Sequence, residues 1–468
     1  MALIKSISGI RGTIGGRAGD NLTPEDAVLF AAAYAMWLKS NHDIDNIRVV
    51  IGRDARISGP MISQLVTQTL VACGIDVIDL GLSTTPTVEV AVPDFHAQGG
   101  IIITASHNPK EWNALKLLNQ KGEFISFEEG NKLIQIADRG NILYEHVDHL
   151  GQIQYIENGY IDEHIEKILA LPLVNIPLIK KSRFRIAVDA VNSTGGIAIP
   201  RLLKKLGVDY IYELYCEPNG HFPHNPEPLP AHLADLSYWV VQEKCDLGIT
   251  VDPDVDRLAM VCEDGSMFGE EYTLVAVADY ILEHTPGNTV SNLSSTRALK
   301  DITEQKGHRY ESAAVGEVNV VKRMKEIHAV IGGEGNGGVI YPALHYGRDA
   351  LVGIALFLSH LAHKKSTASS LRDSFPAYVI SKNKIELTAD IPLDSLLDKL
   401  ALHYAHHPIN TEDGLRIEFE SGWVHLRRSN TEPIIRIYAE SKNEKQANQL
   451  AEEIITQIIE LKTNIATS

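Results

Sequence analysis

Three alternating aspartates, in the stretch TVDPDVDRLAM at residues 250–260, give the strongest chemical signal in the chain. Asp252, Asp254 and Asp256 follow the apolar run LGIT, so we expect them at the carboxyl end of a strand. In a regular strand, side chains with a period of two line one face, where three neighbouring carboxylates would repel one another. A tight loop that curls around a cation would bring their oxygens together, and hard oxygen ligands select Mg²⁺ or Ca²⁺. The alternative is an acidic, solvated turn, because Asp and Pro both favour turns.

A serine and a histidine stand side by side in IIITASHNPKEWNALK, residues 101–116. Ser106 beside His107 suggests a nucleophile with its base, but neighbouring residues of an extended chain point to opposite faces. No GxSxG elbow surrounds the serine, which argues against an acyl-transfer enzyme. Ser106 follows GGIIIT, and we expect it at the carboxyl end of a buried strand, where α/β domains build their sites. A buried or turn-forming serine is the alternative interpretation.

Two further stretches have residues that suit polar ligands, one a polyhydroxylated molecule and the other a phosphate. GGEGNGG, residues 332–338, is neither a P-loop nor a dinucleotide fingerprint, but its Glu334 and Asn336 could hydrogen-bond a polyhydroxylated ligand. Taken alone, this segment is better interpreted as a flexible loop. LRRSNTEPIIRIYAE, residues 426–440, offers hydroxyls, turn amides and guanidinium groups that suit a phosphate dianion, although a solvated loop would look similar. Its candidate residues are Arg427, Ser429, Asn430, Thr431 and Arg436.

Arginines follow or fall within several of the glycine-rich turns. Arg257 directly follows the three aspartates, which is unusual for a site that binds only a cation and indicates that a phosphate also arrives there. Arg11 lies in SGIRG, and Arg53 and Arg56 lie in GRDARISG. Each of these is a weak signal by itself, because surface arginines usually serve solubility.

The elements that must position these residues repeat three times. A short β-branched run, a turn rich in Gly, Ser or Asn, an apolar helical stretch and a second strand follow one another from residue 47, from Phe184 and from Asn288. In the first copy we expect a strand near 47–51 and a helix near 59–73. The apolar residues at helical spacing are Ile62, Leu65, Val66 and Leu70 in the first copy and Leu202, Leu203 and Leu206 in the second. The pattern predicts three α/β domains with mainly parallel strands.

The C-terminal part has a different pattern. NKIELTADI and LRIEFESGWVHLRRSNTEPIIRIYAES alternate as antiparallel strands do, and NEKQANQLAEEIITQIIELK predicts a closing amphipathic helix. We therefore predict three similar βαβ-based, mixed-sheet α/β domains followed by a smaller α+β domain. The predicted limits of the four domains are 1–160, 161–265, 266–377 and 378–468.

Composition bounds the class of protein. The chain has 468 residues, 44% of them hydrophobic and 22% of them charged, as in an ordinary soluble protein of several domains. No apolar run approaches the roughly 18 residues that span a bilayer, and we expect no signal peptide. The net charge of -17 argues against nucleic acid, and an anionic substrate would need positive charge gathered locally. Four cysteines without metal-ligand spacing predict unpaired thiols and a cytoplasmic location.

Taken together and in this order, the four motifs resemble those of the α-D-phosphohexomutase superfamily, and the resemblance covers essentially the whole chain. It implies four domains in a heart shape around a central cleft, to which each domain contributes one loop. It also implies that Ser106 of TASHNP carries a phosphoryl group. With that serine, Asp252, Asp254 and Asp256 would bind one Mg²⁺ per chain.

The same resemblance assigns the substrate-binding residues. Glu334 and Asn336 match the sugar-recognition loop of the family, and Arg257 follows the aspartates as it does there. The phosphate-binding loop of the family matches Arg427, Ser429, Asn430, Thr431 and Pro433, with Arg436 beyond it. An Asn at position 336, where glucose- and mannose-specific relatives usually have Ser, favours glucosamine phosphate as the substrate. A phosphoglucomutase/phosphomannomutase of dual specificity is the close alternative.

The implied reaction interconverts a hexose 6-phosphate and a hexose 1-phosphate through a 1,6-bisphosphate. Phosphorylated Ser106 would give its phosphoryl group to the substrate, with His107 as a hydrogen-bond partner of the phosphate and Arg11 in the catalytic set. Lys116, in NALK, stands where the family has a candidate general base, and a cationic cluster around it would depress its pKa. Some relatives have a His where this chain has Glu317, and this difference places more weight on Lys116.

Convergence of these loops would give an acidic protein a basic cleft. Its cations would be Arg11, Arg53, Lys116, Arg257, Arg348, Arg427 and Arg436. The expected partners are a hexose phosphate and its 1,6-bisphosphate, with neither nucleic acid nor membrane, and assembly into a homodimer is left open. Two functions of other classes stay as alternatives: a non-catalytic sugar-phosphate-binding homologue, and a sugar-bisphosphate synthase that uses an outside phosphoryl donor. Intact Ser106, aspartates and Lys116 argue against the first.

Overall fold

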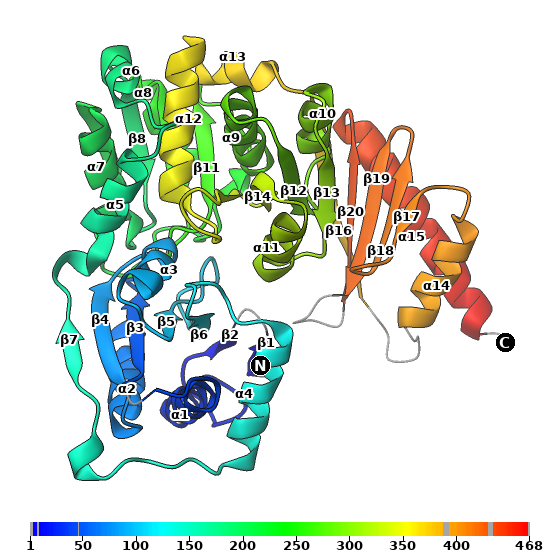
Figure 1. Ribbon diagram of the computed structural model, residues 1–468. Coiled ribbons are helices and arrows are strands. Elements are labelled where there is room, and N and C mark those ends of the chain that lie inside the picture. Colours follow the sequence, from blue (N-terminus) through cyan, green and yellow to red (C-terminus); the bar gives the residue numbers. More distant parts are fainter. Residues whose placement is uncertain (1–2, 7–8, 45, 387–392, 429–433, 467–468) are drawn as a thin grey trace.

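Four β-sheets follow one another along the chain in the computed structural model, which describes residues 3–6, 9–44, 46–386, 393–428 and 434–466. Each sheet forms a lobe with its own helices. The lobes lie in an arc, with the first and the fourth at its two ends (Figure 1).

The first sheet has seven strands in the order β1-β2-β6-β5-β3-β4-β7. Its central part, β4-β3-β5-β6, consists of three parallel strands and an antiparallel fourth strand, β6. The strands are β1 (Ile4–Ser6), β2 (Gly9–Thr13), β3 (Arg48–Arg53), β4 (Asp76–Leu82), β5 (Gly99–Ile103), β6 (Trp112–Asn119) and β7 (Ile153–Tyr155). The helices are α1 (Pro24–Asn41), α2 (Gly59–Ala72), α3 (Thr85–Asp94) and α4 (Phe127–Arg139).

The second and third sheets repeat that central arrangement. Their orders are β9-β8-β10-β11 and β13-β12-β14-β15, and in both sheets three parallel strands are followed by an antiparallel fourth. The predicted threefold repeat of βαβ units in mixed, mainly parallel sheets is therefore confirmed. The strands are β8 (Arg185–Asp189), β9 (Tyr210–Leu214), β10 (Leu247–Val251), β11 (Leu258–Cys262), β12 (Asn288–Asn292), β13 (Tyr310–Ala313), β14 (Ala329–Glu334) and β15 (Gly338–Ile340).

Helix α12 (Ala350–Lys364) joins the second and third lobes into one core. It packs against α5 (Ile161–Leu169), α6 (Ile176–Ser182) and α7 (Gly195–Leu206) of the second lobe and against α9 (Glu270–His284) of the third. A single hydrophobic cluster runs through both lobes. Because burial of apolar surface on all sides fixes this helix, the residues at its N-terminus are held firmly where the first three lobes meet. The remaining helices of these lobes are α8 (Ala234–Gln242), α10 (Ala298–Gln305), α11 (Glu317–Glu326) and α13 (Ala368–Asp373).

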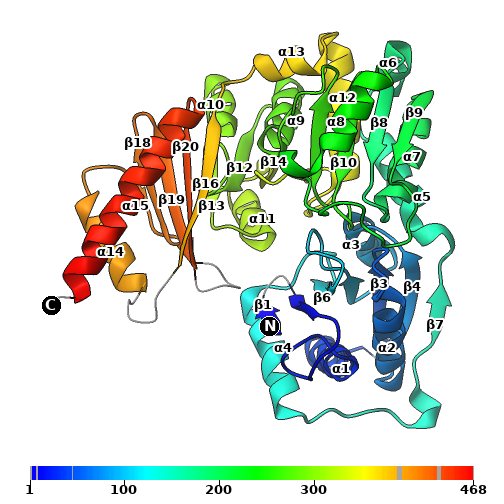
Figure 2. The same ribbon diagram turned by 180° about the vertical axis from the view of Figure 1, so that it is seen from behind.

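The last sheet is antiparallel, in the order β16-β20-β19-β18-β17. Its strands are β16 (Val379–Glu386), β17 (Ile409–Asn410), β18 (Leu415–Phe419), β19 (Gly422–Arg428) and β20 (Ile434–Ser441). Two helices, α14 (Leu393–His403) and α15 (Glu444–Ala466), cover the same face of the sheet (Figure 2). The predicted α+β domain with a closing helix is confirmed, and residues 387–391 of the predicted strand NKIELTADI lie outside the described residues.

The structure agrees with the local predictions. The expected strand near 47–51 is β3, and the expected helix near 59–73 is α2, whose Ile62, Val66 and Leu70 are fully buried. All four cysteines are free thiols. Among the described residues, none of the helices combines the length and the apolar character needed to cross a membrane. The domain limits at 160, 265 and 377 stay predictions.

Candidate active site

Loops at the same position of the three repeats meet at the centre of the molecule. The loop after β5 carries Ser106, the loop after β10 carries Asp252, Asp254 and Asp256, and the turn after β14 carries Asn336. Each of these loops joins the third parallel strand of its sheet to the antiparallel fourth. The first two are in direct contact, because Ser106 Oγ donates a hydrogen bond to Asp252 Oδ2 at 2.6 Å. The repeat thus explains how residues far apart in the sequence reach one site.

The serine loop is held in a turn that brings Ser106 and His107 together. Ser106 has a φ of 51°, and its Oγ lies 3.3 Å from His107 Nδ1. The expectation that the two side chains point to opposite faces is wrong, because this loop is not extended. Arg56 is fully buried, pairs with Asp54 at 3.0 Å and donates hydrogen bonds to four main-chain oxygens between residues 106 and 112. Arg56 therefore positions the serine loop.

The aspartate loop is tight, as predicted, and presents buried oxygens without partners. Val255 has a φ of 65°, and the N–H groups of Asp256 and Arg257 donate to Asp252 Oδ1 at 3.2 and 3.1 Å. One carboxylate oxygen of each aspartate lies within 4.8 Å of the others. Oδ1 of Asp254 and Oδ1 of Asp256 have no hydrogen-bond partner among the described residues. Burial, followed by the charges of Asp256 and Asp254, raises the pKa of Asp252 well above its ordinary value. Such crowded, unpaired oxygens fit a hard divalent cation.

Lys116 of β6 neutralises part of this negative charge. Its Nζ donates to Asp254 Oδ2 at 2.6 Å and to Asp256 Oδ2 at 3.3 Å, and the residue is only 3% exposed. Burial works to lower the pKa of Lys116, but the charges of Asp254 and Asp256 outweigh it, and the pKa is raised. The predicted depression of this pKa is therefore wrong. The nearest charges around the ammonium group are carboxylates and not the expected cluster of cations.

Arg348, between β15 and α12, links the aspartate loop to the third lobe. Its guanidinium donates to Asp256 Oδ2 at 2.8 Å, Glu317 Oε2 at 2.9 Å and Glu334 Oε2 at 2.9 Å. All four side chains are nine-tenths or more buried. Burial raises the pKa of Glu317 to about 7 even though Arg348 opposes the shift. The sequence named Arg348 only as one of several cations, and nothing in its local pattern indicated that three carboxylates surround it.

The sugar-loop residues differ in how much of their bonding capacity the protein uses. Glu334 Oε1 accepts hydrogen bonds from Asn292 Nδ2 at 2.8 Å and from the Gly316 N–H at 3.0 Å, while Oε2 accepts from Arg348. Asn336 Oδ1 accepts only the Gly338 N–H, at 3.2 Å. Glu334 is therefore fixed by the protein, whereas Asn336 keeps an amide group for a ligand.

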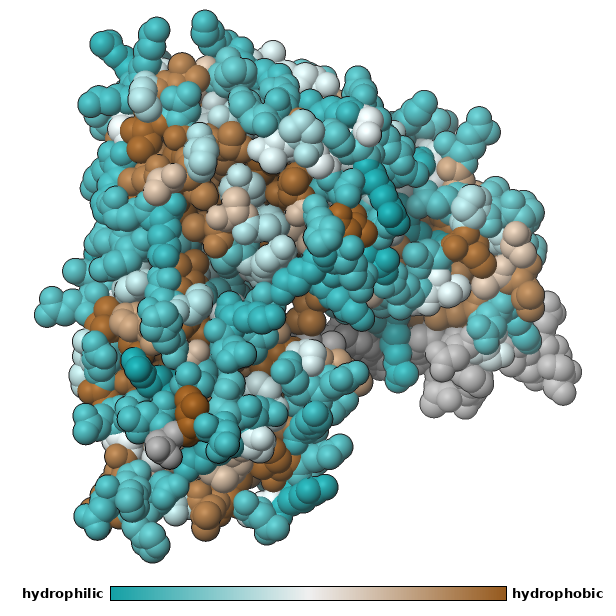
Figure 3. Space-filling view, in the orientation of Figure 1, coloured by the Kyte–Doolittle hydropathy of each residue, from teal (hydrophilic) through white to brown (hydrophobic). Residues whose placement is uncertain are grey.

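A cavity of about 240 Å³ lies where loops of the four lobes converge. It is lined by His107 of the first lobe, Arg257 of the second, Asn336 of the third, and Arg427 and Arg436 of the fourth. Figure 3 shows the molecule hollowed between the first lobe, at its lower left, and the fourth lobe, at its right. The structure therefore brings predicted residues from all four parts of the chain to one cavity.

The remaining predicted cations differ in their positions. Arg11 donates to Asn108 Oδ1 of the serine loop at 2.8 Å, and burial lowers the pKa of Arg11 to about 10. Arg427 forms an ion pair with Asp413 at 2.8 Å. Arg53 donates to a main-chain oxygen beside it. Contrary to the predicted basic cleft, four of the predicted cations do not line the cavity: Arg11, Arg53, Lys116 and Arg348. The phosphate-loop residues that lie outside the described part of the chain are Ser429, Asn430, Thr431 and Pro433.

Sequence reasoning missed several residues that line the same cavity. Glu227 Oε1 lies 3.4 Å from Arg257 Nη1 and 3.9 Å from His107 Nε2. Lys382 of β16 is paired across the sheet with Tyr438 of β20, and both line the cavity. No sequence motif surrounds these residues. Only Lys382 and Tyr438 could have been found from the sequence, through the alternating polar and apolar residues of β16 and β20.

Models of the four domains of one protein family match almost the whole chain. Phosphoglucomutase/phosphomannomutase alpha/beta/alpha domains I, II and III match residues 3–142, 162–265 and 269–378. The C-terminal domain of the same family matches residues 384–457. The four matches follow the order of the four lobes.

Whole-length relatives lead to the same family. A phosphoglucomutase/phosphomannomutase of Thermococcus kodakarensis is 34% identical over 447 residues, which are 94% of this chain and 96% of that protein. A protein named as a probable phosphoglucosamine mutase of Methanopyrus kandleri is 33% identical over 451 residues, 96% of each chain. A crystal structure of a phosphoglucomutase/phosphomannomutase family protein from Burkholderia thailandensis superimposes with a TM-score of 0.83 at 25% identity and covers 98% of this chain and 97% of that one.

Fold and site thus define an α-D-phosphohexomutase architecture, with a buried serine and three aspartates at the centre of four lobes. The chain belongs to the phosphoglucomutase/phosphomannomutase family.

Proposed function

We propose that the chain is a phosphohexomutase that interconverts glucosamine 6-phosphate and glucosamine 1-phosphate through a phosphoserine at Ser106. The observation that carries the proposal is the hydrogen bond from Ser106 Oγ to Asp252 Oδ2, at 2.6 Å, inside the aspartate cluster. A serine whose hydroxyl donates to a carboxylate among the candidate cation ligands suits the storage and transfer of a phosphoryl group.

The reaction consists of two phosphoryl transfers. In the first, the free hydroxyl oxygen of the hexose monophosphate bonds to the phosphorus on Ser106, the bond from that phosphorus to Ser106 Oγ breaks, and a 1,6-bisphosphate forms. In the second, after the intermediate has turned, Ser106 Oγ bonds to the other phosphorus and the bond from that phosphorus to the hexose oxygen breaks. The hexose oxygen takes up the proton released in the first transfer, which gives the isomeric monophosphate and phosphorylated Ser106. One Mg²⁺ bound by Asp252, Asp254 and Asp256 supplies positive charge that stabilises the transferred group.

The phosphate that does not react is held by the cationic side of the cavity. Arg257, Arg427 and Arg436 line it, and guanidinium groups bind phosphate oxygens in pairs. Ser429, Asn430 and Thr431 are predicted to complete this phosphate site. Asn336 offers its amide group to the sugar hydroxyls, and Glu334 Oε2, which accepts one hydrogen bond from Arg348, keeps a lone pair for the same purpose.

Proton transfer falls to groups other than Lys116. Because its pKa is raised, Lys116 stays protonated and serves as a positive charge beside Asp254 and Asp256. Burial, followed by the charges of Arg257 and Arg11, holds the pKa of His107 well below its ordinary value, so the ring is neutral and able to hydrogen-bond the phosphoserine. Glu317, which accepts from Arg348 at 2.9 Å and has a pKa of about 7, is the carboxyl of the Arg348 network matched to accept a proton near neutral pH.

The choice of sugar rests on Asn336, as in relatives that act on amino sugars, and on the name of the Methanopyrus kandleri relative. A phosphoglucomutase/phosphomannomutase is the second candidate, because the Thermococcus kodakarensis relative carries that name at 34% identity. A cytoplasmic location and a homodimer stay predictions.

A side-by-side assay distinguishes these functions. The purified protein is given Mg²⁺, a trace of the matching 1,6-bisphosphate and, in separate reactions, the 1-phosphates of glucosamine, N-acetylglucosamine, mannose and glucose. We expect glucosamine 1-phosphate to give the highest kcat/KM. Equal or higher values for mannose and glucose would establish the dual-specificity alternative. Turnover of none of the four, or turnover that needs a stoichiometric outside donor, would overturn the mutase proposal.

A further inference from the structure

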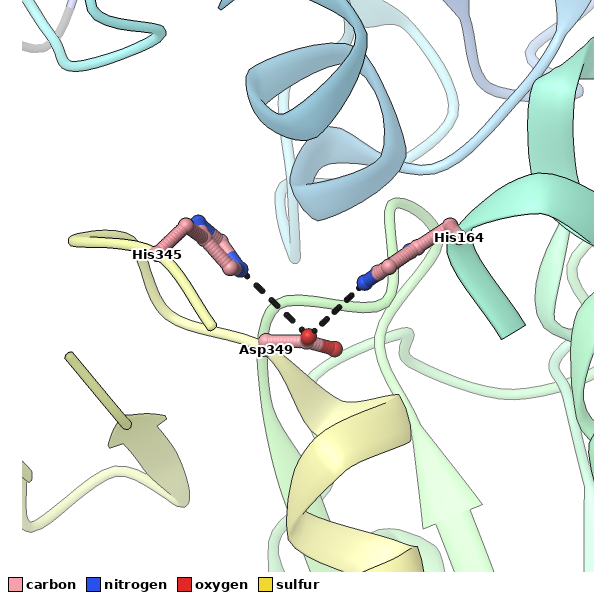
Figure 4. A group of neighbouring side chains, drawn as sticks. All are labelled: His164, His345 and Asp349. Carbon is pink, nitrogen blue, oxygen red and sulfur yellow. Dashed lines mark hydrogen bonds and ion pairs between the residues drawn. The ribbon is translucent and has the colours of Figure 1, made fainter. Parts of the chain in front are cut away.

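Two histidines and an aspartate meet where the first three lobes join. His164 lies on α5 of the second lobe, His345 lies between β15 and α12 of the third, and Asp349 is the N-cap residue of α12. His164 and Asp349 are fully buried, and the His345 side chain is 12% exposed. Figure 4 shows the two rings pointing at the same carboxylate oxygen of Asp349 from two sides. None of these residues takes part in the reaction proposed above.

The spacing of their ligand atoms is that of a metal site. His164 Nε2 lies 3.1 Å and His345 Nε2 lies 3.4 Å from Asp349 Oδ2. A zinc ion with ligand distances of about 2.0–2.1 Å places two tetrahedral ligands about 3.3 Å apart. One ligand atom of each residue lies within 4.8 Å of the others, and the two rings are 83° apart in plane. Small movements of the three side chains therefore suffice to surround an ion.

Helix α3 of the first lobe places an oxygen near the outer nitrogen of each ring. Thr87 Oγ1 lies 3.0 Å from His164 Nδ1, and Glu89 Oε2 lies 3.4 Å from His345 Nδ1. Metal-binding histidines characteristically donate this second N–H to a carboxylate or another acceptor. Oδ1 of Asp349 accepts two N–H groups from the first turn of α12, so its Oδ2 faces the rings.

Glu89 gives independent support for a ligand at this place. Its side chain is 1% exposed, and neither carboxylate oxygen has a hydrogen-bond partner among the described residues. Burial, followed by the charge of Glu317, raises the pKa of Glu89 well above its ordinary value, because an ionised carboxylate without partners is costly to bury. Zinc bound to His345 Nε2 would polarise the ring and strengthen the Nδ1–H donor that faces Glu89.

A second His/acid group in the chain lacks these features. Asp279, Glu283 and His360 also lie close enough together to hold an ion. However, Lys306 lies 3.0 Å from Asp279, and Lys364 lies 2.5 Å from Glu283. This group offers one imidazole instead of two, and both of its carboxylates are paired with lysines, so it serves as an internal control for a zinc site.

We propose that His164, His345 and Asp349 bind one Zn²⁺ ion, with a water molecule as the fourth ligand and Thr87 and Glu89 behind the two rings. Imidazole nitrogen selects zinc over Mg²⁺, which separates this site from the all-oxygen aspartate site. Zn²⁺ binding releases any proton on Nε2 of His164 and His345, because a nitrogen that binds a metal carries no proton. The ion ties α5 to the N-terminus of α12, next to Arg348.

The test uses the full chain, stripped with a chelator and kept in excess Mg²⁺ to fill the aspartate site. We expect it to take up one equivalent of Zn²⁺. With Co²⁺ as the probe, we expect the intense visible bands of a tetrahedral nitrogen-containing site. His345→Asn should lose this binding, whereas the control His360→Asn should keep it. Thr87→Val should weaken Zn²⁺ binding by roughly 10-fold or more, because it removes only a partner of a ligand.

Thermal unfolding provides a second measurement. Zn²⁺ should raise the Tm of the wild type and of His360→Asn and leave that of His345→Asn unchanged. His345 is partly exposed, so its variant is expected to fold, as circular dichroism can verify. Any of three results would overturn the proposal. The stripped and reloaded wild type could hold no stoichiometric Zn²⁺, the Co²⁺ bands could be weak and octahedral, or the wild type and His345→Asn could bind Zn²⁺ with equal affinity. A loss in His360→Asn equal to that in His345→Asn would overturn it as well.

Discussion

Replacement of Arg348 by methionine tests the buried network that connects the aspartate loop to the third lobe. The guanidinium reaches Asp256, Glu317 and Glu334 at 2.8–2.9 Å, and its side chain is 10% exposed. Removal of one member of a buried ion pair costs about 3–5 kcal/mol, because the other charges stay buried without compensation. We therefore expect Arg348→Met to lower the free energy of unfolding by about that amount.

Arg323→Met is the matched control. Arg323 also contacts three carboxylates, those of Glu311, Glu326 and Glu412, but its side chain is 31% exposed. Exposed ion pairs are screened by water, so we expect a loss of at most about 1 kcal/mol. Urea unfolding followed by circular dichroism measures both variants against the wild type.

The pH dependence of the stability lost in Arg348→Met distinguishes a loss caused by unpaired charge from a loss caused by packing. In the wild type, burial works to raise the pKa of Glu334, but Arg348 and the hydrogen-bond donors outweigh it and the pKa is lowered. Without Arg348, burial raises the pKa of Glu334 and of Glu317 in the folded state. When the pKa of a carboxyl is higher in the folded than in the unfolded protein, the protein loses stability as the pH rises from the unfolded-state pKa toward the folded-state pKa. The defect should therefore be larger at about pH 8 than at about pH 5.5. A defect that is independent of pH, or equal losses in the two variants, would refute the reasoning.

Three further predictions concern charge and cofactor. Burial raises the pKa of Glu440 to about 7, so the free energy of unfolding of the wild type should fall by roughly 3 kcal/mol between about pH 4.5 and pH 7. Glu440→Gln should remove this fall. The same pH dependence of the unfolding free energy in both proteins would contradict the prediction. Lys116→Met should lower kcat by roughly 100-fold or more, because it removes the positive charge beside Asp254. Lys116→Arg keeps the charge and should retain more activity. Equal kcat values for the two variants would assign Lys116 a role other than charge. Removal of divalent cations with EDTA should abolish turnover, and added Mg²⁺ should restore it. Asp256→Asn should need more Mg²⁺ than the wild type. Turnover that survives EDTA would exclude a required cation at the aspartate site.

The sequence was sufficient for features that depend on local patterns. The βαβ repeat follows from apolar periodicity, and the tight aspartate loop follows from three closely spaced acids whose mutual repulsion a bound cation would remove. The equivalent places of the Ser106 and Asp252 loops follow from the repeat, because each loop ends the equivalent strand of its own sheet, whereas their contact across 146 residues does not.

Features that depend on long-range pairing could not be predicted. Arg348 lies 92 residues from Asp256, and His164 lies 185 residues from Asp349. The direction of the Lys116 pKa shift depends on whether carboxylates or cations lie nearer, which only the folded arrangement decides. The contact between Ser106 and His107 depends on a left-handed φ at a residue that is not glycine, which no sequence rule requires.

Mass spectrometry of the purified chain tests the central claim, that Ser106 carries the transferred phosphoryl group. We predict that a fraction of the intact protein carries one phosphoryl group, that fragmentation places it on Ser106, and that glucosamine 6-phosphate discharges it. Ser106→Ala should carry no phosphoryl group and show no mutase activity, while its circular dichroism stays that of the wild type. A phosphoryl group on another residue, or substantial turnover by Ser106→Ala, would contradict the account.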